Sequence, residues 1–135
     1  MMRNSSEVVS NPNSQGRKNR GYKDLLAWQR AMQMVRAVYE LTAQFPIAER
    51  FGLSGQMRRA AISVPSNIAE GYGRVTAGEF IQFLGHARGS SAEVETQLMI
   101  AKDLHFGSDE TIDDAERLCF EVSRLLTGLM RSLKT

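Results

Sequence analysis

The 135-residue chain has little of several residue types, and each shortage excludes a class of protein. A single cysteine, Cys119, excludes an internal disulfide and a zinc site built on paired cysteines, and it favours a reducing compartment. No segment approaches the ~18 to 20 consecutive apolar residues of a membrane span, and the N-terminus lacks the apolar run of a signal peptide. These shortages predict a cytoplasmic protein.

Positive and negative charges are also nearly balanced over most of the chain. It holds 17 Lys and Arg against 15 Asp and Glu, for a formal charge of +2, and 42% of its residues are hydrophobic. Residues 1–21 contain four of the basic groups and only one acidic group, so the remainder is slightly acidic. The composition is that of a folded globular domain without a strongly basic body.

The chain divides into a polar tail and one folded domain. Residues 1–21 combine Ser, Asn, Gly and basic side chains with almost no apolar periodicity, which predicts a disordered tail. From residue 22 onward apolar residues recur at helical spacing, without the alternation of a strand. We therefore expect a single all-α domain over residues 22–135.

Four amphipathic helices joined by short turns are expected in this domain. The first covers residues 24–45, and its predicted core seam is Leu25, Trp28, Met32, Val35, Tyr39 and Thr42. The second covers residues 53–71 and contains Pro65, which removes one backbone hydrogen bond. We expect a kink at Pro65, where one of three polar side chains bonds the freed backbone groups: Ser63, Ser66 or Asn67.

The third and fourth helices begin at recognisable caps. Thr76 and Glu79 form a capping box for the third helix, which ends near residues 106–107, and Ser108 or Asp109 caps the fourth. The third seam is Phe80, Phe83, Ala87, Ser91, Val94, Leu98, Ala101 and His105, and the fourth is Ile112, Ala115, Cys119, Val122, Leu126, Leu129 and Leu133. The four segments predict an antiparallel up-and-down four-helix bundle.

The domain lacks the patterns of familiar helical metal sites and enzymes. Neither His86 nor His105 has a carboxylate three residues before it, as di-iron bundles require, so we expect no metal and no cofactor. One enzyme interpretation stays open, with a cleft between the second and third helices lined by Arg58, Arg59, Glu70, Glu93 and Glu95. We favour the alternative that these charges pair with one another across the two helices.

Several motifs go beyond generic helix patterns. They are Tyr22-Lys23-Asp24-Leu25, Trp28-Gln29, Val38-Tyr39, Phe45-Pro46, Phe51-Gly52-Leu53 and residues 56–61, 63–71 and 89–98. In this order the motifs resemble the four-helix-bundle family encoded in intervening sequences of bacterial 23S rRNA genes, which is related to the accessory variability determinant proteins of diversity-generating retroelements. The resemblance covers residues 22–133 and leaves out the tail.

The resemblance implies a cytoplasmic bundle that assembles into a ring-like homopentamer. It also carries a polar signature onto this chain, which we expect to set helix register or a subunit interface: Gln56, Arg59, Ser63, Pro65, Asn67, Glu70, Ser90, Glu93, Glu95 and Gln97. Within this region Arg59, Ser63, Ser66 and Glu70 share one helical stripe. A second stripe, Arg88, Ser91 and Glu95, is expected to meet it across the helix pair.

The favoured function is a non-enzymatic homo-oligomer that binds RNA or DNA, or assembles a ribonucleoprotein. The side chains expected to contact phosphates are Arg58, Arg30, Arg36, Arg50 and Arg74. An alternative is a scaffold that binds a protein partner, for example as an accessory subunit of a reverse transcriptase. The small helical enzyme with an Arg/Glu cleft is the least favoured hypothesis.

Overall fold

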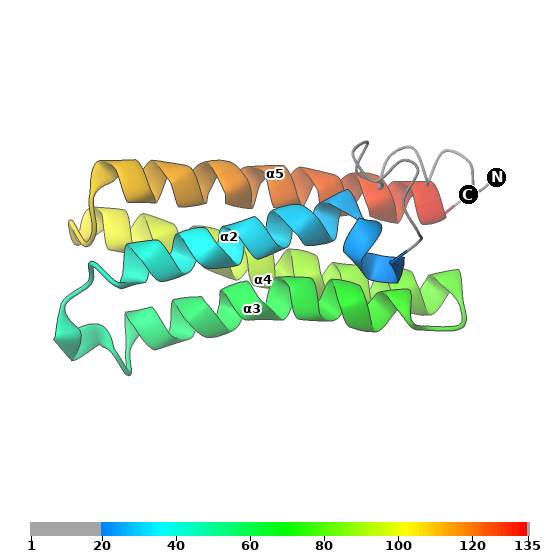
Figure 1. The fold of residues 1–135 in the computed structure, drawn as a ribbon, viewed down its shortest axis with the longest axis horizontal. Helices are drawn as coiled ribbons and strands as arrows, with labels where there is room; N and C mark the ends of the chain where they lie inside the picture. Colours follow the sequence, from blue (N-terminus) through cyan, green and yellow to red (C-terminus); the bar gives the residue numbers. More distant parts are fainter. Residues whose placement is uncertain (1–19, 135) are drawn as a thin grey trace.

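The computed structural model describes residues 20–134, and the regular structure of that part is helical, with no strand. The elements in order are η2 (Gly21–Asp24), α2 (Leu26–Thr42), η3 (Ile47–Glu49), α3 (Leu53–Tyr72), α4 (Ala77–Asp103) and α5 (Asp109–Leu133), where η denotes a short 3-10 helix. The four α-helices lie side by side along one long axis (Figure 1). The prediction of an all-helical fold built on four helices is confirmed.

The predicted tail, residues 1–21, lies outside the described residues apart from Arg20 and Gly21. The Arg20 backbone N–H and Nε donate to the two carboxylate oxygens of Asp24, at 2.9 and 3.3 Å. Among the described helices, none combines the length and the apolar character needed to cross a membrane.

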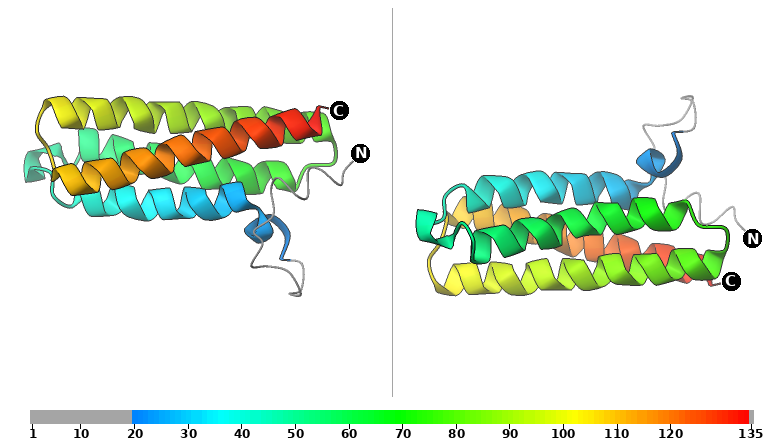
Figure 2. Two further views of the ribbon diagram at one scale, coloured as in Figure 1. Left: turned by 90° about the horizontal axis from the view of Figure 1, so that it is seen from above. Right: turned by 90° about the horizontal axis from the view of Figure 1, so that it is seen from below.

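Each α-helix packs against two neighbours around a common core. α2 contacts α3 and α5, and α4 contacts the same two helices from the other side (Figure 2). The core draws on all four, with Met34, Met57, Leu98 and Leu126 fully buried. Burial of one apolar face of every helix is the main source of stability in such a bundle.

The core seam predicted for the first helix is wrong in its middle. Leu25 and Thr42 are buried as expected, but Trp28, Met32 and Val35 are only half-buried and Tyr39 is exposed. The buried stripe of α2 instead consists of Ala27, Ala31, Met34, Val38 and Leu41. Two apolar stripes lie about 100° apart on this helix, and the one with small alanines faces the neighbours because helices approach most closely there.

The seams predicted for the other long helices agree better with the structure. In α5 all predicted seam residues are buried except the half-buried Leu133. In α4 the predicted seam residues Ala87, Ser91, Val94, Leu98 and Ala101 are buried, whereas Phe80 and Phe83 are half-buried and His105 is exposed. Gln97 is buried although the apolar pattern did not include it.

The helix ends follow the predicted caps. The Thr76 hydroxyl accepts the Glu79 N–H at 3.1 Å and Glu79 accepts the Thr76 N–H at 3.4 Å, which completes the capping box of α4. Ser108 caps α5 by accepting the Thr111 N–H at 3.2 Å. α4 ends earlier than expected, at Asp103, and the turn after it contains two residues with positive φ, His105 (59°) and Gly107 (78°).

Pro65 is buried inside α3, which runs as one element from Leu53 to Tyr72. The Asn67 side-chain amide donates to the Ser63 carbonyl at 2.8 Å. A polar neighbour of the proline therefore bonds the backbone, but not at the expected place. The bonded carbonyl is not the one that Pro65 leaves without a donor, which belongs to Ala61. The kink at Pro65 stays a prediction.

Candidate nucleic-acid interface

Five residues of the polar signature line a cleft between α3 and α4. The cleft has a volume of about 280 Å³ and is lined by Gln56, Arg59, Ala60, Ser63, Ser90 and Glu93. The hydroxyls of Ser63 and Ser90 are hydrogen-bonded across it at 2.9 Å. Within residues 20–134 neither Arg59 nor Glu93 forms an ion pair. The serine pair fixes the register of α3 against α4.

The predicted meeting of the Ser91 stripe with α3 is wrong. Ser91 is fully buried and its hydroxyl bonds Ser123 on α5 at 2.9 Å, so this stripe faces α5. The α4 residues that line the cleft with α3 are Ser90, one residue before Ser91, and Glu93. A shift of one residue rotates a side chain by about 100°, which is enough to exchange one neighbour for the other.

The remaining signature residues lie in different places. Pro65 is buried, Asn67 is half-buried beside Ser63, and Glu95 is exposed. Glu70 pairs with Arg74 at 2.7 Å within one turn of helix. Gln97 is buried, and its Oε1 has no hydrogen-bond partner among the described residues. Of the polar signature, only the five residues that line the α3/α4 cleft therefore lie together.

The structure does not bring together the five charges of the enzyme interpretation. Arg59 and Glu93 share the α3/α4 cleft, but Arg58 lies against Tyr39 of α2. Glu70 is paired with Arg74, which is not one of the five. The alternative, in which these charges pair with one another across the two helices, is also wrong for the described part of the chain.

Of the five arginines expected to contact phosphates, two lie together. Arg30 pairs with Glu121 of α5 at 2.9 Å, and Arg74 is held by Glu70 and stacks 4.7 Å from the Phe83 ring centroid. Arg36 is exposed on α2 and has no ion pair within residues 20–134. Arg50 and Arg58 line one cavity at the end of the bundle that carries η3.

We call this hollow the end cavity; it has a volume of about 330 Å³ and lies between the end of α2, η3 and the first turn of α3. Its lining is Thr42, Ala43, Phe45, Pro46, Ile47, Arg50, Ser54, Gly55 and Arg58. Arg58 Nε donates to the Thr42 hydroxyl at 2.8 Å, and its guanidinium lies 4.4 Å from the Tyr39 ring centroid. Neither arginine has an ion-pair partner in the described part of the chain, so both charges remain available to an anion.

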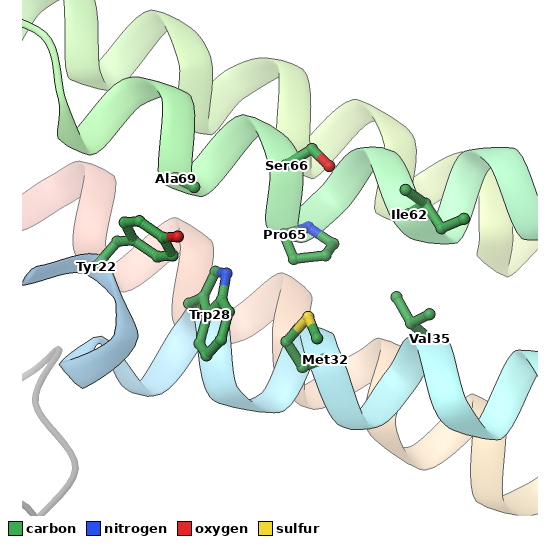
Figure 3. A pocket seen from close by; sticks show the side chains of 8 residues that line it. All are labelled: Tyr22, Trp28, Met32, Val35, Ile62, Pro65, Ser66 and Ala69. Atoms are coloured by element: carbon green, nitrogen blue, oxygen red, sulfur yellow. The ribbon is translucent and has the colours of Figure 1, made fainter. Parts of the chain in front are cut away.

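An apolar groove occupies the same α2/α3 face further along the bundle. It has a volume of about 310 Å³ and is lined by Tyr22, Trp28, Met32, Val35, Ile62, Pro65, Ser66 and Ala69 (Figure 3). Side chains of α2 and α3 face one another across it, and the Tyr22 and Trp28 rings meet edge to face at 5.4 Å. The large apolar residues that the sequence pattern assigned to the core therefore form an outer groove.

Sequence reasoning missed a basic stripe on α5. A hollow there is lined by Phe120, Ser123, Arg124, Thr127, Gly128 and Arg131. Phe120 is 62% exposed, and the Arg124 guanidinium lies 5.8 Å from its ring centroid. The spacing of these residues by three and four is visible in the sequence, since it places Phe120, Arg124 and Arg131 on one helix face.

Comparison with known proteins places these features in a family. The family model described as "23S rRNA-intervening sequence protein" matches residues 23–128. A crystal structure of a protein with unknown function from the S23 ribosomal protein family of Bacteroides thetaiotaomicron is similar in fold, with a TM-score of 0.71, 20% identity and coverage of 78% of this chain and 99% of that one. No curated protein matches the sequence. Because the family model spans nearly all of the four helices, the chain belongs to the 23S rRNA-intervening sequence protein family.

Proposed function

We propose that the protein is a non-enzymatic homo-oligomer that binds RNA, or nucleic acid more generally, through its α2/α3 face. In this proposal the helices alternate up and down, α3 bends at Pro65, five copies close a ring, and the assembly acts in the cytoplasm. The observation that carries the proposal is the convergence of Arg50 and Arg58 at the end cavity without an ion-pair partner among the described residues. Membership of a family named after rRNA intervening sequences supports RNA as the ligand.

Repetition explains how a nearly neutral chain binds a polyanion. A ring repeats one small basic patch on every subunit, so the assembly presents a much larger basic surface than a monomer. Simultaneous contacts at several subunits raise the affinity well above that of one patch. The exposed apolar groove supports self-association, because apolar surface that lies between two helices is typical of protein contacts.

Binding of a structured RNA and of single-stranded DNA, measured by fluorescence anisotropy over a salt series, tests this function. We expect the logarithm of the association constant to fall linearly with the logarithm of salt concentration, because phosphate contacts release counterions. Replacement of Arg50 and Arg58 by Ala should weaken binding at least about tenfold and reduce the salt slope by about one for each arginine that touches a phosphate.

The matched control is the double variant Arg30→Ala and Arg74→Ala, which removes the same charge from two arginines that already hold carboxylates. We expect it to weaken binding by less than about threefold, since surface-paired guanidinium groups are partly neutralised. Equal weakening by the two double variants, or no binding of either nucleic acid at low salt, contradicts the proposal. A chain without residues 1–19 tests whether the bundle binds without the tail.

The apolar groove favours a second candidate function, a scaffold for another protein such as a reverse transcriptase. Met32, Val35 and Ile62 offer the kind of surface that a helix of a partner packs against. A stoichiometric partner that stays bound after nuclease treatment, and is lost when Ile62 is replaced by Glu, would support the scaffold. Loss of the partner upon nuclease treatment would support the nucleic-acid function instead.

A further inference from the structure

We propose that the end cavity binds a phosphate monoester, the group that terminates a phosphorylated nucleic-acid strand. The choice of a nucleic-acid end rests on the proposed function above. The inference adds a chemical preference, for a terminal phosphate over the phosphodiesters within a strand. It assigns the recognition to Ser54, Arg50, Arg58 and the first turn of α3.

Ser54 adds a hydroxyl donor to the cavity beside the two arginines. It is only 7% exposed, it lines the cavity, and its hydroxyl bonds no other residue in the described part of the chain. Gln97 Oε1 is the only fully buried side-chain polar atom without a partner within residues 20–134, so the Ser54 hydroxyl is accessible and can donate to an acceptor that enters the cavity. A phosphate oxygen is such an acceptor.

The start of α3 adds backbone donors at the same place. The first four N–H groups of an α-helix have no partner within the helix, and their dipoles favour a negative charge. Here the Leu53 N–H donates to the Glu49 carboxylate at 3.2 Å, so one of these donors is taken. Ser54 and Gly55 follow in the same turn, line the cavity, and have no backbone acceptor within residues 20–134.

Two guanidinium groups complete the site. Arg58 uses Nε for its bond to Thr42, so that its two terminal nitrogens keep their N–H groups for a ligand. Its stacking on Tyr39 holds the group in one orientation before a ligand arrives. The Arg50 guanidinium lies 5.3 Å from the Phe51 ring centroid. Arginine forks match the oxygens of a phosphate, particularly where two of them act together.

Charge favours a monoester over a diester. A monoester carries about −1.5 to −2 charges at neutral pH, against one for each phosphate of a strand, so it gains more from two guanidinium groups and a helix N-terminus. The walls of the cavity come from α2, the Pro46–Ile47 segment and α3. Phe51, 87% exposed beside Arg50, provides a ring on which the terminal base can stack, and Ile47, 85% exposed, adds an apolar contact.

Two measurements test the inference. In the first, inorganic phosphate is titrated into the ¹⁵N-labelled full chain, and we expect saturable shifts of the Ser54 and Gly55 amides. In the second, one oligonucleotide is compared with a 5′-phosphate and with a 5′-hydroxyl, and we expect the phosphorylated form to bind about tenfold more tightly, about 1.4 kcal/mol. Shifts spread evenly over all basic residues, or equal affinity of the two oligonucleotides, would overturn the inference.

Variants separate the site from general electrostatics. Ser54→Ala leaves the net charge unchanged, and we expect it to reduce the preference for the 5′-phosphate to about threefold or less, because it removes one hydrogen bond to a charged group. Arg50→Ala should also reduce the preference, whereas Arg36→Ala, which removes the same charge outside the cavity, should leave it intact. A preference that survives both cavity variants, or falls equally in Arg36→Ala, would refute the assignment.

The two proposals fail in different ways. If the 5′-hydroxyl oligonucleotide binds with steep salt dependence but the 5′-phosphate adds nothing, the nucleic-acid function stands and the monoester site is wrong. If neither oligonucleotide binds but inorganic phosphate saturates the Ser54 and Gly55 shifts, the site stands as one for a small phosphorylated molecule and the nucleic-acid function is wrong.

Discussion

Arg58 illustrates how the environment of a single residue decides whether its charge is available. The sequence places Arg58 beside Arg59, and helical geometry separates them by about 100°, which predicts that one pairs internally while the other faces solvent. The structure directs Arg58 to Thr42 and Tyr39 and Arg59 to the α3/α4 cleft, and neither meets a carboxylate within the described residues. Helix periodicity predicted the divergence, but long-range partners such as Glu121 for Arg30 had no sequence signal.

The pH dependence of stability is predicted to include a contribution from Cys119. Burial raises the pKa of its thiol, and a hydrogen bond with Ser91 opposes only part of this effect. Above about pH 8.5 the unfolded chain loses the thiol proton while the folded chain keeps it. Ionisation therefore stabilises the unfolded state alone, and the free energy of unfolding falls as pH rises. Below that pH the contribution is fully present.

Urea denaturation of the wild-type chain and of Cys119→Ala, at neutral pH and again above pH 9, measures this contribution. We expect the wild-type chain to lose more unfolding free energy than the variant over this interval, because only the wild-type chain has the thiol. Identical losses in the two proteins would show that the thiol does not titrate differently in the folded and unfolded states.

At the scale of the elements, the sequence predicts the existence, order and caps of the helices because these depend on neighbouring residues. The capping box at Thr76 and the cap at Ser108 are local, and both are confirmed. The buried face of α2 was not predictable from periodicity, because Trp28, Met32 and Val35 have the same spacing as the buried Ala27, Ala31 and Met34. Which stripe is buried depends on how closely α3 and α5 approach, a property of the assembled bundle.

The close approach of α3 and α4 yields a prediction about two helical glycines. A Cβ atom at Gly71 would lie 2.7 Å from the Phe83 Cβ, whereas one at Gly89 would meet nothing within 4 Å. Gly71→Ala should therefore lower the unfolding free energy by about 1 to 3 kcal/mol through overpacking. Gly89→Ala should raise it by up to about 1 kcal/mol through helix propensity.

Thermal or urea unfolding of both glycine variants checks this pair, with each serving as the control for the other. The opposite signs are the decisive feature, since the two replacements add the same methyl group to a helix. A Gly71→Ala protein at least as stable as the wild type would mean that α3 and α4 are not in close contact at this point.

At the scale of the whole molecule, one face combines the features that the proposed function needs. The α2/α3 face carries the apolar groove along part of its length and the end cavity with Arg50 and Arg58 at one end. The formal charge of +2 does not indicate this arrangement, because it is the sum over a basic N-terminal segment and a nearly neutral bundle. The sequence predicted arginines as the ligand-binding groups but had no means of bringing two of them to one cavity.

The groove provides a direct test of assembly. Ile62, in the groove, and Ile100, on α4, are 42% and 43% exposed, so they form a matched pair. Ile62→Glu should shift the protein toward monomer, because it places an unpaired charge in the subunit contact. Ile100→Glu should leave the oligomer intact if the contact is confined to the groove. Sedimentation velocity at micromolar concentration distinguishes these outcomes.

Sedimentation velocity of the wild-type protein with a fluorescent structured RNA tests the central claim most directly, since it reports assembly and binding together. At about 50 mM salt we predict that the RNA moves as one species with several copies of the protein, and that about 500 mM salt releases the RNA while the protein oligomer persists. A monomeric protein at micromolar concentration, or RNA that sediments alone at the lower salt concentration, would contradict the account.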